Sequence, residues 1–343
     1  MSKPKVALNG FGRIGRAFLQ LALRDDSFDV VVINDLMPIE NSEYLFKYDT
    51  AHGIDSSVSV SPDGKNLLFD NRAIKYISER NPDNLPWSDL GVEVVVETTG
   101  VFTSYEKSMV HLKAGAKKVV ISAPVKDKPQ GGIKGATALV GINDRVINKC
   151  DITSNASCTT NASAIPLKVL NDEIGVEKAI LNTIHSYTSS QNIVDGQTRK
   201  GKNLRLGRAG AQNMIPSTTG AAVATTKVLT ELEGKFDGVS IRVPVVLGSI
   251  VDITFLSKRS TSVEEVNDIF RSAADNPIYE KFFAVAEDPI VSSDMIGCPF
   301  AAVADLHSTR VVDGNLVKVF VWYDNETGYS STLLAHTKRA LGI

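Results

Sequence analysis

A glycine-rich turn near the N-terminus constrains the fold of this chain more than any other feature. Gly10, Gly12 and Gly15 form the pattern G-x-G-x-x-G directly after the apolar run at 5–9, and they open a stretch of helical periodicity at 12–26. In this pattern the first glycine permits a tight turn, the second lets the backbone approach a pyrophosphate, and the third allows close helix–strand packing. The helix N-terminus also favours an anion. The context therefore predicts a dinucleotide site.

β-branched runs and helical stretches alternate through the first part of the chain. Further strands are predicted at 30–34, 93–99 and 117–123, with helical stretches at 42–48 and 105–115. Strands spaced by helices imply parallel βαβ units. The sequence therefore predicts an α/β fold whose first part is a doubly wound parallel sheet.

The pattern changes after about residue 150. A helix is predicted from Thr159 to about Glu173, and long β-rich stretches follow at 239–258 and 316–324. This pattern predicts a second α+β domain with a mixed or antiparallel sheet and its helices on one side. A polar stretch at 189–213 is too long for a simple turn, and loops of that length are usually functional or disordered.

The length of 343 residues favours two domains. We predict a dinucleotide-binding domain over 1–157 and a catalytic domain over 158–325. The C-terminal helix, at about 326–343, is expected to pack back onto the first domain.

Composition excludes several classes of protein. A formal net charge of −2 argues against a general nucleic-acid binder. No stretch approaches the roughly 20 apolar residues of a membrane span, and the N-terminus lacks the apolar run of a signal peptide. The three cysteines include no C-x-x-C pair. We therefore expect a cytoplasmic enzyme without a metal site.

Asp35 favours NAD as the dinucleotide. It follows the second predicted strand and lies 20 residues after Gly15 (35 − 15), where a carboxylate meets the adenosine ribose hydroxyls. A carboxylate there would repel a 2′-phosphate. The preference is for NAD and does not exclude NADP.

Cys158 is the candidate nucleophile because it lies where the chain turns helical, in SNASCTTN. Ser157 or a neighbouring polar residue can cap this helix, and a helix N-terminus is expected to lower the thiol pKa. Cys150 and Cys298 are interpreted as structural cysteines. His185, 27 residues after Cys158 (185 − 158), is a candidate base, although spacing alone leaves a structural histidine equally open.

Six strings resemble the glyceraldehyde-3-phosphate dehydrogenase family: NGFGRIGR, SNASCTTN, HSYT, RAGAQNMIPSTTGAA, FDGVSIRVP and WYDNETGYS. They occur in the family's order over residues 9–330. The resemblance implies a Rossmann NAD-binding domain, a thiohemiacetal and then a thioester on Cys158, proton transfer to His185, and cleavage of the thioester by inorganic phosphate. It also implies a homotetramer in which the loop 189–213 reaches the cofactor site of a neighbouring subunit.

The resemblance also implies the residues of each binding site. Thr188 and Arg242 match the family's substrate-phosphate residues. Its inorganic-phosphate residues are matched by Ser157, Thr159, Thr219 and Gly220. Beyond the glycines of the turn, its cofactor residues are matched by Arg13, Ile14, Asp35, Arg80, Ser122 and Asn325.

Some residues depart from the family pattern, and three other functions stay open. Gln197 stands where NAD-preferring members commonly carry proline, which points to some use of NADP, and Thr327 replaces a usual tryptophan. Erythrose-4-phosphate dehydrogenase is disfavoured because His185 is followed by Ser-Tyr-Thr. An arsenate-using paralogue stays open. A thiol redox sensor is disfavoured because Cys158 and His185, like Thr188 and Arg242, are all retained.

Overall fold

The computed structural model describes residues 2–70, 72–198 and 203–343. The chain folds into two compact units. The first unit holds the residues up to 156 together with 330–343, and the second holds 157–329.

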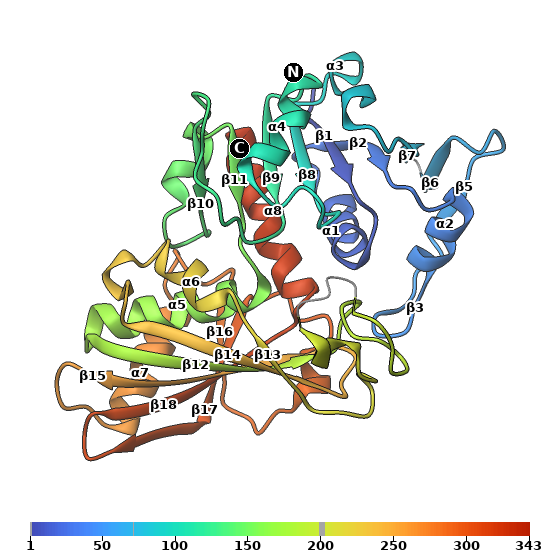
Figure 1. The fold of residues 1–343 in the computed structure, drawn as a ribbon. Helices are drawn as coiled ribbons and strands as arrows, with labels where there is room; N and C mark the ends of the chain where they lie inside the picture. Colours follow the sequence, from blue (N-terminus) through green and yellow to red (C-terminus); the bar gives the residue numbers. More distant parts are fainter. Residues whose placement is uncertain (1, 71, 199–202) are drawn as a thin grey trace. The chain divides into compact units, whose positions relative to one another are not determined.

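The first unit contains a mainly parallel sheet (Figure 1). Its strand order is β10 (Gly135–Thr137), β11 (Ile152–Ser154), β9 (Lys118–Ile121), β8 (Val94–Glu97), β1 (Lys5–Asn9), β2 (Asp29–Asn34), β7 (Arg72–Ile77), β6 (Asn66–Phe69) and β5 (Val58–Val60). All neighbours from β10 to β7 pair in parallel, whereas β7, β6 and β5 pair antiparallel. The chain order reverses between β8 and β2, on either side of β1, and ligands of such sheets bind at the carboxyl ends of the strands there.

The helices of this unit agree with the periodicity of the sequence. α1 (Arg13–Leu23) buries Phe18 and Leu19, and α4 (Tyr105–Lys113) begins where the Ser104 side chain accepts a hydrogen bond from the Lys107 N–H, at 3.1 Å. The other helical segments are α2 (Ile39–Lys47), α3 (Trp87–Leu90), η1 (Pro82–Asn84), η2 (Asp144–Lys149) and most of α8 (Thr327–Leu341). A short hairpin joins β3 (Tyr48–Asp49) to β4 (Gly53–Ile54).

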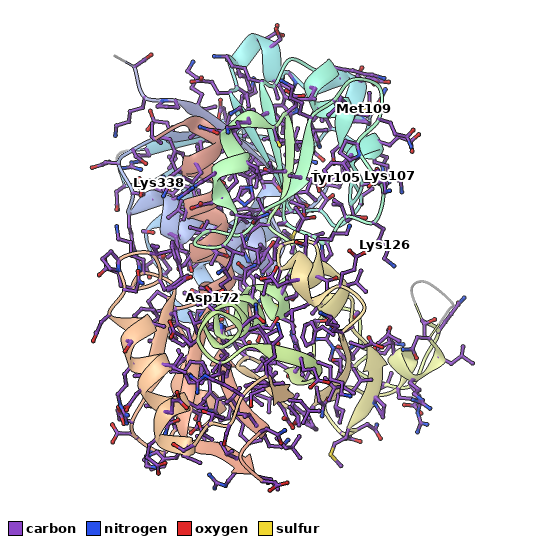
Figure 2. All side chains as sticks on the ribbon, turned by 90° about the vertical axis from the view of Figure 1, so that its left-hand side faces the viewer. Tyr105, Lys107, Met109, Lys126, Asp172 and Lys338 are labelled. Atoms are coloured by element: carbon purple, nitrogen blue, oxygen red, sulfur yellow. The ribbon has the colours of Figure 1, made fainter. Side chains whose placement is uncertain are left out.

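Side chains of α4 and α8 make different kinds of contact within this unit, and Figure 2 labels Tyr105, Lys107 and Lys338 among them. Tyr105 is buried among Val119, Ile121 and Ile152, whereas Lys107, two residues further along α4, is exposed. Lys338 on α8 pairs with Asp25, just beyond the end of α1, at 2.8 Å.

The second unit contains a mixed sheet. Its strand order is β13 (Ile215–Thr218), β14 (Phe236–Val243), β12 (Val176–Ser186), β15 (Ser249–Ser257), β18 (Leu316–Tyr323), β17 (Ala302–Val312) and β16 (Phe283–Ala286). The predicted β-rich stretch at 239–258 is therefore two strands, β14 and β15, and β12 lies between them, parallel to β14 and antiparallel to β15.

The helices of the second unit form one layer. α5 (Cys158–Glu173) contacts α6 (Ala221–Thr226), α7 (Val263–Ala274) and several strands of the sheet. The remaining helical turns are η3 (Leu204–Gly207), η4 (Thr230–Leu232) and η5 (Ser292–Met295). β15 alternates strictly between buried and half-buried residues, as expected for a strand with one face on the core. The α/β class with a mixed second sheet is confirmed.

The described residues lack two kinds of feature. No helix among them is long and apolar enough to cross a membrane. Nor do those residues contain a cluster of three or more histidine, cysteine or acidic side chains that could hold a metal ion.

Candidate functional site

The glycine turn in the first unit has the geometry of a dinucleotide site. Gly10 has φ 101°, and a Cβ there would lie 2.7 Å from the backbone nitrogen of Thr99. A Cβ on Gly15 would overlap the carbonyl oxygen of Gly10. At Gly12, in contrast, a Cβ would meet no described atom within 4 Å. The first and third glycines are thus required by packing, and the second leaves room for a ligand.

The N-terminus of α1 is suited to an anion. Arg13 and Ile14 form its first turn, and the N-cap residue Gly12 makes no side-chain cap hydrogen bond. No acidic residue lies in this turn. Backbone N–H groups and the helix dipole therefore favour a phosphate here. The Arg13 side chain forms an ion pair with Asp49.

Asp35 is anchored to the glycine turn. One of its carboxylate oxygens accepts a hydrogen bond from the Phe11 N–H at 2.5 Å, and the other accepts from the Met37 N–H at 2.8 Å. Each oxygen retains a second lone pair for a ribose hydroxyl. Arg80 is exposed just beyond β7, and Ser122 directly follows β9. The predicted cofactor residues of the first unit thus all lie at the carboxyl ends of parallel strands or in the first turn of α1.

Cys158 in the second unit is the first residue of α5. Ser157 is the N-cap, with extended backbone angles, and its hydroxyl accepts a hydrogen bond from the Thr160 N–H at 3.2 Å. The predicted cap is therefore present. Ala156, directly before Ser157, has φ 53°, a left-handed conformation that is costly for a non-glycine residue.

His185 lies beside the sulfur. Its Nε2 is 3.5 Å from Cys158 Sγ, and the side chain is 4% exposed at the end of β12. The ring packs edge-on against Tyr323, with centroids 5.8 Å apart. The Tyr323 hydroxyl in turn hydrogen-bonds the hydroxyls of Thr159 and Thr183, each at 2.9 Å. The structure thus brings together the two predicted catalytic residues, a pairing that their spacing in the sequence does not decide.

Burial opposes charge on both groups. Burial raises the pKa of the Cys158 thiol, although Arg242 and the Thr159 N–H act in the opposite direction. Burial, followed by the positive charge of Arg242, lowers the pKa of His185 to about 3. The N–H groups at the start of α5 lower the pKa of the Cys158 thiol, as predicted, but the cost of burying the thiolate outweighs them, so the pKa is raised overall.

Arg242 lies against His185, one member of the catalytic pair. Its Nη1 lies 2.6 Å from His185 Nδ1 and donates a hydrogen bond to the Ser186 carbonyl oxygen at 3.0 Å, while Nδ1 itself lies 2.8 Å from that oxygen. Arginine can only donate. A proton on Nδ1 would therefore place two donors 2.6 Å apart, so Arg242 disfavours the tautomer in which Nε2 accepts a proton.

The remaining phosphate-site residues lie in separate local arrangements. The Thr188 hydroxyl bonds Ser190 at 2.9 Å, and its N–H donates to Gln191 at 2.8 Å. The Thr219 hydroxyl accepts from the Ala221 N–H at 3.1 Å, and Gly220 is the N-cap of α6. Among the described residues, no hydrogen bond joins Thr188 to Arg242.

Asn325 has a fixed amide orientation. Its Oδ1 accepts hydrogen bonds from the hydroxyls of Ser186 (2.9 Å) and Ser249 (3.1 Å) and from the Gly248 N–H (3.3 Å). The Nδ2 group is therefore the side available to donate to a carboxamide oxygen. Sequence reasoning missed Ser249 and Tyr323, although Tyr323 lies only two residues before Asn325 in the chain.

Comparisons with known proteins identify the family. The model described as "Glyceraldehyde 3-phosphate dehydrogenase, NAD binding domain" matches residues 4–105, and the corresponding C-terminal domain model matches 157–325. The chain is 44% identical over 328 residues to glyceraldehyde-3-phosphate dehydrogenase 1 of Trichoderma koningii, covering 95% of this chain and 94% of that protein. Identity is also 44% to the corresponding proteins of Bacillus cereus, over 96% of both chains, and of Geobacillus stearothermophilus, over 95% of both.

The chain belongs to the glyceraldehyde-3-phosphate dehydrogenase family. It is an NAD-dependent oxidoreductase, so the predicted family and cofactor are confirmed. The glycine turn fits this cofactor on the geometry of Gly10, Gly12 and Gly15 alone.

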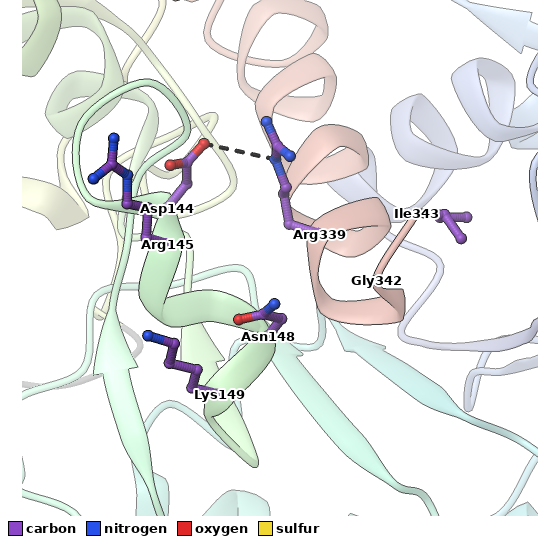
Figure 3. A pocket seen from close by; sticks show the side chains of 7 residues that line it. All are labelled: Asp144, Arg145, Asn148, Lys149, Arg339, Gly342 and Ile343. Atoms are coloured by element: carbon purple, nitrogen blue, oxygen red, sulfur yellow. Dashed lines mark ion pairs between the residues drawn. The ribbon is translucent and has the colours of Figure 1, made fainter.

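A cavity elsewhere in the first unit holds none of these residues. It has a volume of about 510 Å³ and lies between η2 and the end of α8 (Figure 3). An ion pair between Asp144 and Arg339, at 3.6 Å, spans it. Arg145 and Lys149 add positive charge at its rim. Among the described residues that line this cavity, no nucleophile lies beside a base as Cys158 lies beside His185. The size of the cavity alone does not indicate a function.

Proposed function

We propose that Cys158 and His185 carry out the family's reaction, oxidation of D-glyceraldehyde 3-phosphate to 1,3-bisphosphoglycerate with reduction of NAD. The observation that carries the proposal is the position of Cys158 at the start of α5 with its sulfur 3.5 Å from His185 Nε2. A nucleophile at a helix start and a base within reach are the arrangement that thioester chemistry needs.

The Cys158 sulfur attacks the aldehyde carbon, so that an S–C bond forms while the carbonyl π bond breaks. The thiol proton passes to the carbonyl oxygen, which becomes the hydroxyl of a thiohemiacetal. NAD, when bound, supplies the hydride acceptor. His185 Nε2 takes the hydroxyl proton as the hydride leaves, and the carbonyl reforms as a thioester. Inorganic phosphate then attacks this carbonyl, the S–C bond breaks, and the sulfur leaves as a thiolate. His185 Nε2, 3.5 Å from the sulfur, is the group that takes the hydroxyl proton, and the thiolate regains a proton from solvent water or from phosphate before the next turnover.

The cofactor residues we assign are those at the carboxyl ends of the first sheet, together with Asn325 in the second unit. Asp35, held by two backbone N–H groups, would bind the ribose hydroxyls. Asn325 would donate from Nδ2 to the nicotinamide carboxamide. Because Asp35 repels a 2′-phosphate, NAD is preferred, and Gln197 leaves some use of NADP.

We assign two anion sites to the second unit. Thr188 and Arg242 bind the substrate phosphate. The attacking phosphate is bound by Ser157 and Thr159, with Thr219 and Gly220. Hydroxyls and backbone N–H groups with one arginine suit a phosphate that must bind and leave. The family relatives and the retained Thr188 favour the three-carbon substrate over erythrose 4-phosphate.

We further propose a cytoplasmic homotetramer. The loop 189–213, of which residues 199–202 lie outside the described residues, exposes large apolar side chains: Ile193 is 91%, Val194 73% and Leu204 78% exposed. Apolar groups this exposed are expected to be covered by another protein surface, and the resemblance assigns a second copy of the chain. Sedimentation analysis should give the mass of four chains, and a monomeric mass would refute the proposal.

The activity test is the initial rate of NADH formation from D-glyceraldehyde 3-phosphate with and without phosphate. Parallel runs use NADP, arsenate and erythrose 4-phosphate. Cys158→Ala should abolish turnover while NAD still binds, and Cys298→Ala is the matched control because Cys298 is a half-buried thiol of the same unit whose pKa is raised by burial. Turnover retained in Cys158→Ala would refute the thioester mechanism. Arsenate-dependent turnover without phosphate-dependent turnover would instead support the arsenate-using paralogue.

A further inference from the structure

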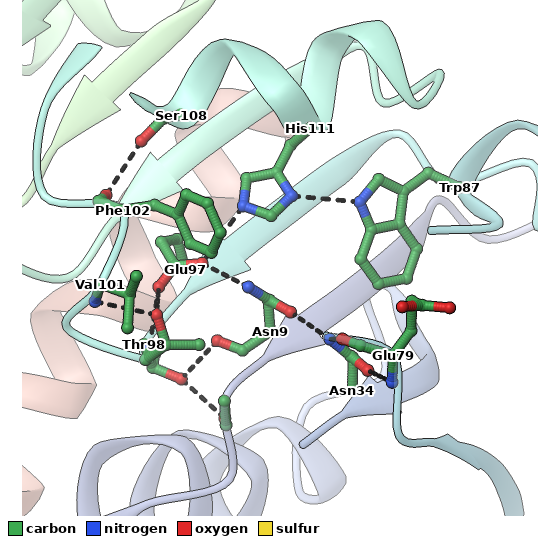
Figure 4. Close-up of polar contacts among 12 residues, drawn as sticks. Asn9, Asn34, Glu79, Trp87, Glu97, Thr98, Val101, Phe102, Ser108 and His111 are labelled. Atoms are coloured by element: carbon green, nitrogen blue, oxygen red, sulfur yellow. Dashed lines mark hydrogen bonds and ion pairs between the residues drawn. The ribbon is translucent and has the colours of Figure 1, made fainter. Parts of the chain in front are cut away.

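A buried carboxylate that the reaction does not use lies beneath the glycine turn. Glu97 is the last residue of β8, and its side chain is 1% exposed. It accepts four hydrogen bonds: from the N–H and the hydroxyl of Thr99, from Asn9 Nδ2 at 2.5 Å, and from His111 Nε2 at 3.2 Å (Figure 4). These bonds satisfy both oxygens of a side chain that burial has removed from water.

The hydrogen positions in this cluster are fixed by Trp87. Its indole N–H is 3.2 Å from His111 Nδ1, and an indole nitrogen can only donate. His111 Nδ1 therefore accepts, and the proton of the neutral ring is on Nε2, where it is donated to Glu97. His111 is fully buried on α4 and cannot gain either partner from water. The hydrogen bonds of His111 thus have one consistent arrangement, in which Nδ1 accepts from Trp87 and Nε2 donates to Glu97.

The chain of hydrogen bonds continues across the sheet from β8 to β1 and β2. Asn9 donates from Nδ2 to Glu97, and its Oδ1 accepts from Asn34 Nδ2 at 2.8 Å. Asn34 in turn bonds the backbone of Glu79 twice: Oδ1 accepts from the N–H at 2.8 Å, and Nδ2 donates to the carbonyl oxygen at 3.1 Å. Asn9 and Asn34 end neighbouring parallel strands, and Glu79 lies two residues beyond β7.

Each of these three residues directly precedes an assigned cofactor residue. Gly10 follows Asn9, Asp35 follows Asn34, and Arg80 follows Glu79. The cluster therefore reaches the ends of β1 and β2 and the segment just beyond β7, each directly before an assigned cofactor residue.

The loop after Glu97 also holds the glycine turn. The Thr98 hydroxyl is 2.7 Å from the Gly10 carbonyl oxygen and 3.1 Å from that of Asn9. A Cβ on Gly10 would lie 2.7 Å from the nitrogen of Thr99, which is itself bonded to Glu97 at 2.8 Å. A shift of the Glu97 carboxylate would therefore displace the surface on which the glycine turn rests.

We propose that Glu97 and His111 are positioning residues that hold the glycine turn, Asp35 and Arg80 in the arrangement that binds NAD. The inference rests on the proposed assignment of these cofactor residues. A buried charge seldom adds stability over an apolar core of the same volume. Its retention at the carboxyl ends of β1, β2 and β8 is accounted for by the directional hydrogen bonds that it imposes on the neighbouring segments.

The first test is Glu97→Gln in the full-length protein. Glutamine keeps the shape but directs an NH₂ group at donors, so the Asn9, Thr99 and His111 bonds cannot all form. We expect the NAD dissociation constant, measured calorimetrically at low temperature, to rise by about tenfold or more, the size of one lost hydrogen bond to a charged group. The KM for NAD should rise with it. The rate at which iodoacetamide labels Cys158, measured without NAD, should stay at the wild-type value because Cys158 lies in the other unit.

A second pair of variants separates positioning from stability. His111→Gln retains a donor toward Glu97 and an acceptor toward Trp87, and it should bind NAD nearly as the wild type does, whereas His111→Leu should not. Tyr105→Phe is the stability control, since it removes a buried hydroxyl bonded to Thr137 in the same unit and should lower the melting temperature without changing NAD affinity.

The outcomes distinguish failure of the positioning role from failure of the cofactor-site assignment on which it rests. If Asp35→Ala weakens NAD binding and Glu97→Gln and His111→Leu do not, although both variants are folded, the positioning role is refuted. If Asp35→Ala also leaves the affinity unchanged, the cofactor-site assignment fails first. Equal losses of affinity in Tyr105→Phe and Glu97→Gln would show that the effect is only loss of stability.

Discussion

Arg242 is expected to act on the chemistry of Cys158 as well as on substrate binding. Its guanidinium lies 2.6 Å from His185 Nδ1, and the opposite nitrogen of that ring lies 3.5 Å from Cys158 Sγ. After burial, which raises the pKa of the thiol, Arg242 is the largest influence and lowers it. Arg242→Met keeps an unbranched side chain and removes the charge. The thiol pKa should therefore rise, and less thiolate should be present at any pH below it.

The size of the effect follows from the two contacts. The two contacts lie on opposite sides of one imidazole ring, so the positive charge of Arg242 is within about 8 Å of the sulfur. At that distance and an effective dielectric constant of about 20, its attraction for the thiolate is about 2 kcal/mol. At a fixed pH this corresponds to a roughly 30-fold lower thiolate fraction. Carbamidomethylation of Cys158 by iodoacetamide should slow by about that factor, and its pH profile should move to higher pH.

The same variant tests phosphate recognition. Loss of a charge-assisted hydrogen bond costs about 1.5–3 kcal/mol, so kcat/KM should fall further for D-glyceraldehyde 3-phosphate than for unphosphorylated glyceraldehyde. Arg310→Met is the control, since Arg310 lies in the same unit and its guanidinium donates to the carbonyl oxygens of His307 and Thr309, away from the catalytic pair. An unchanged labelling rate, or a profile displaced to lower pH, would refute the electrostatic argument. An equal loss with both aldehydes would show that Arg242 does not bind the phosphate.

Three further perturbations have expected outcomes. His185→Asn should lower kcat by about 100-fold or more because the base is removed, with NAD affinity by calorimetry unchanged; a near-normal kcat would exclude His185 as the base. Tyr323→Phe leaves the hydroxyls of Thr159 and Thr183 without their shared partner and should cost about 1–3 kcal/mol in urea unfolding, whereas no change would mean that water replaces the hydroxyl. Asp25→Asn tests the link to α8: burial raises the pKa of Asp25, but bonds from Lys338 and Ser27 lower it overall to about 2. Because the folded pKa is lowered, the wild type should be more stable than Asp25→Asn above about pH 4, by about 1 kcal/mol once solvent screening of this near-surface ion pair is allowed for. That advantage should be lost as pH falls towards about 2, and an advantage that persists at that pH would exclude the ion pair as its source.

Local patterns were sufficient to predict the strands that carry the dinucleotide site. β1, β2, β8 and β9 are short apolar runs separated by helical periodicity, and parallel pairing follows from that alternation. The antiparallel strands β5 to β7 were not predicted. Their turn signal, Pro62-Asp63-Gly64, was present in the sequence, and Gly64 has the positive φ of 66° that such a turn requires.

In the second unit, the sequence did not reveal which strands are neighbours, because the strands that pair are distant from one another in the chain. The stretch 239–258 looked continuous because both strands within it are β-branched, yet β14 and β15 lie on opposite sides of β12. The start of α5 and the end of β12 bring Cys158 and His185 together for a similar reason. Neither relationship follows from periodicity, because the pairing partners are distant in the chain.

The remaining part of the site depends on which nitrogen or oxygen atoms carry hydrogen. A sequence motif does not specify those positions. In the first unit a group that can only donate, Trp87, fixes every proton as far as Glu97. In the second unit, Arg242 can likewise only donate, and its guanidinium lies 2.6 Å from His185 Nδ1. The base form of His185 carries its proton on Nδ1, bonded to the Ser186 carbonyl oxygen, and that form is incompatible with a donor at 2.6 Å. We therefore expect Arg242 to move away from Nδ1 when His185 accepts a proton. A substrate phosphate that draws the guanidinium toward itself would release the base at the moment the substrate binds.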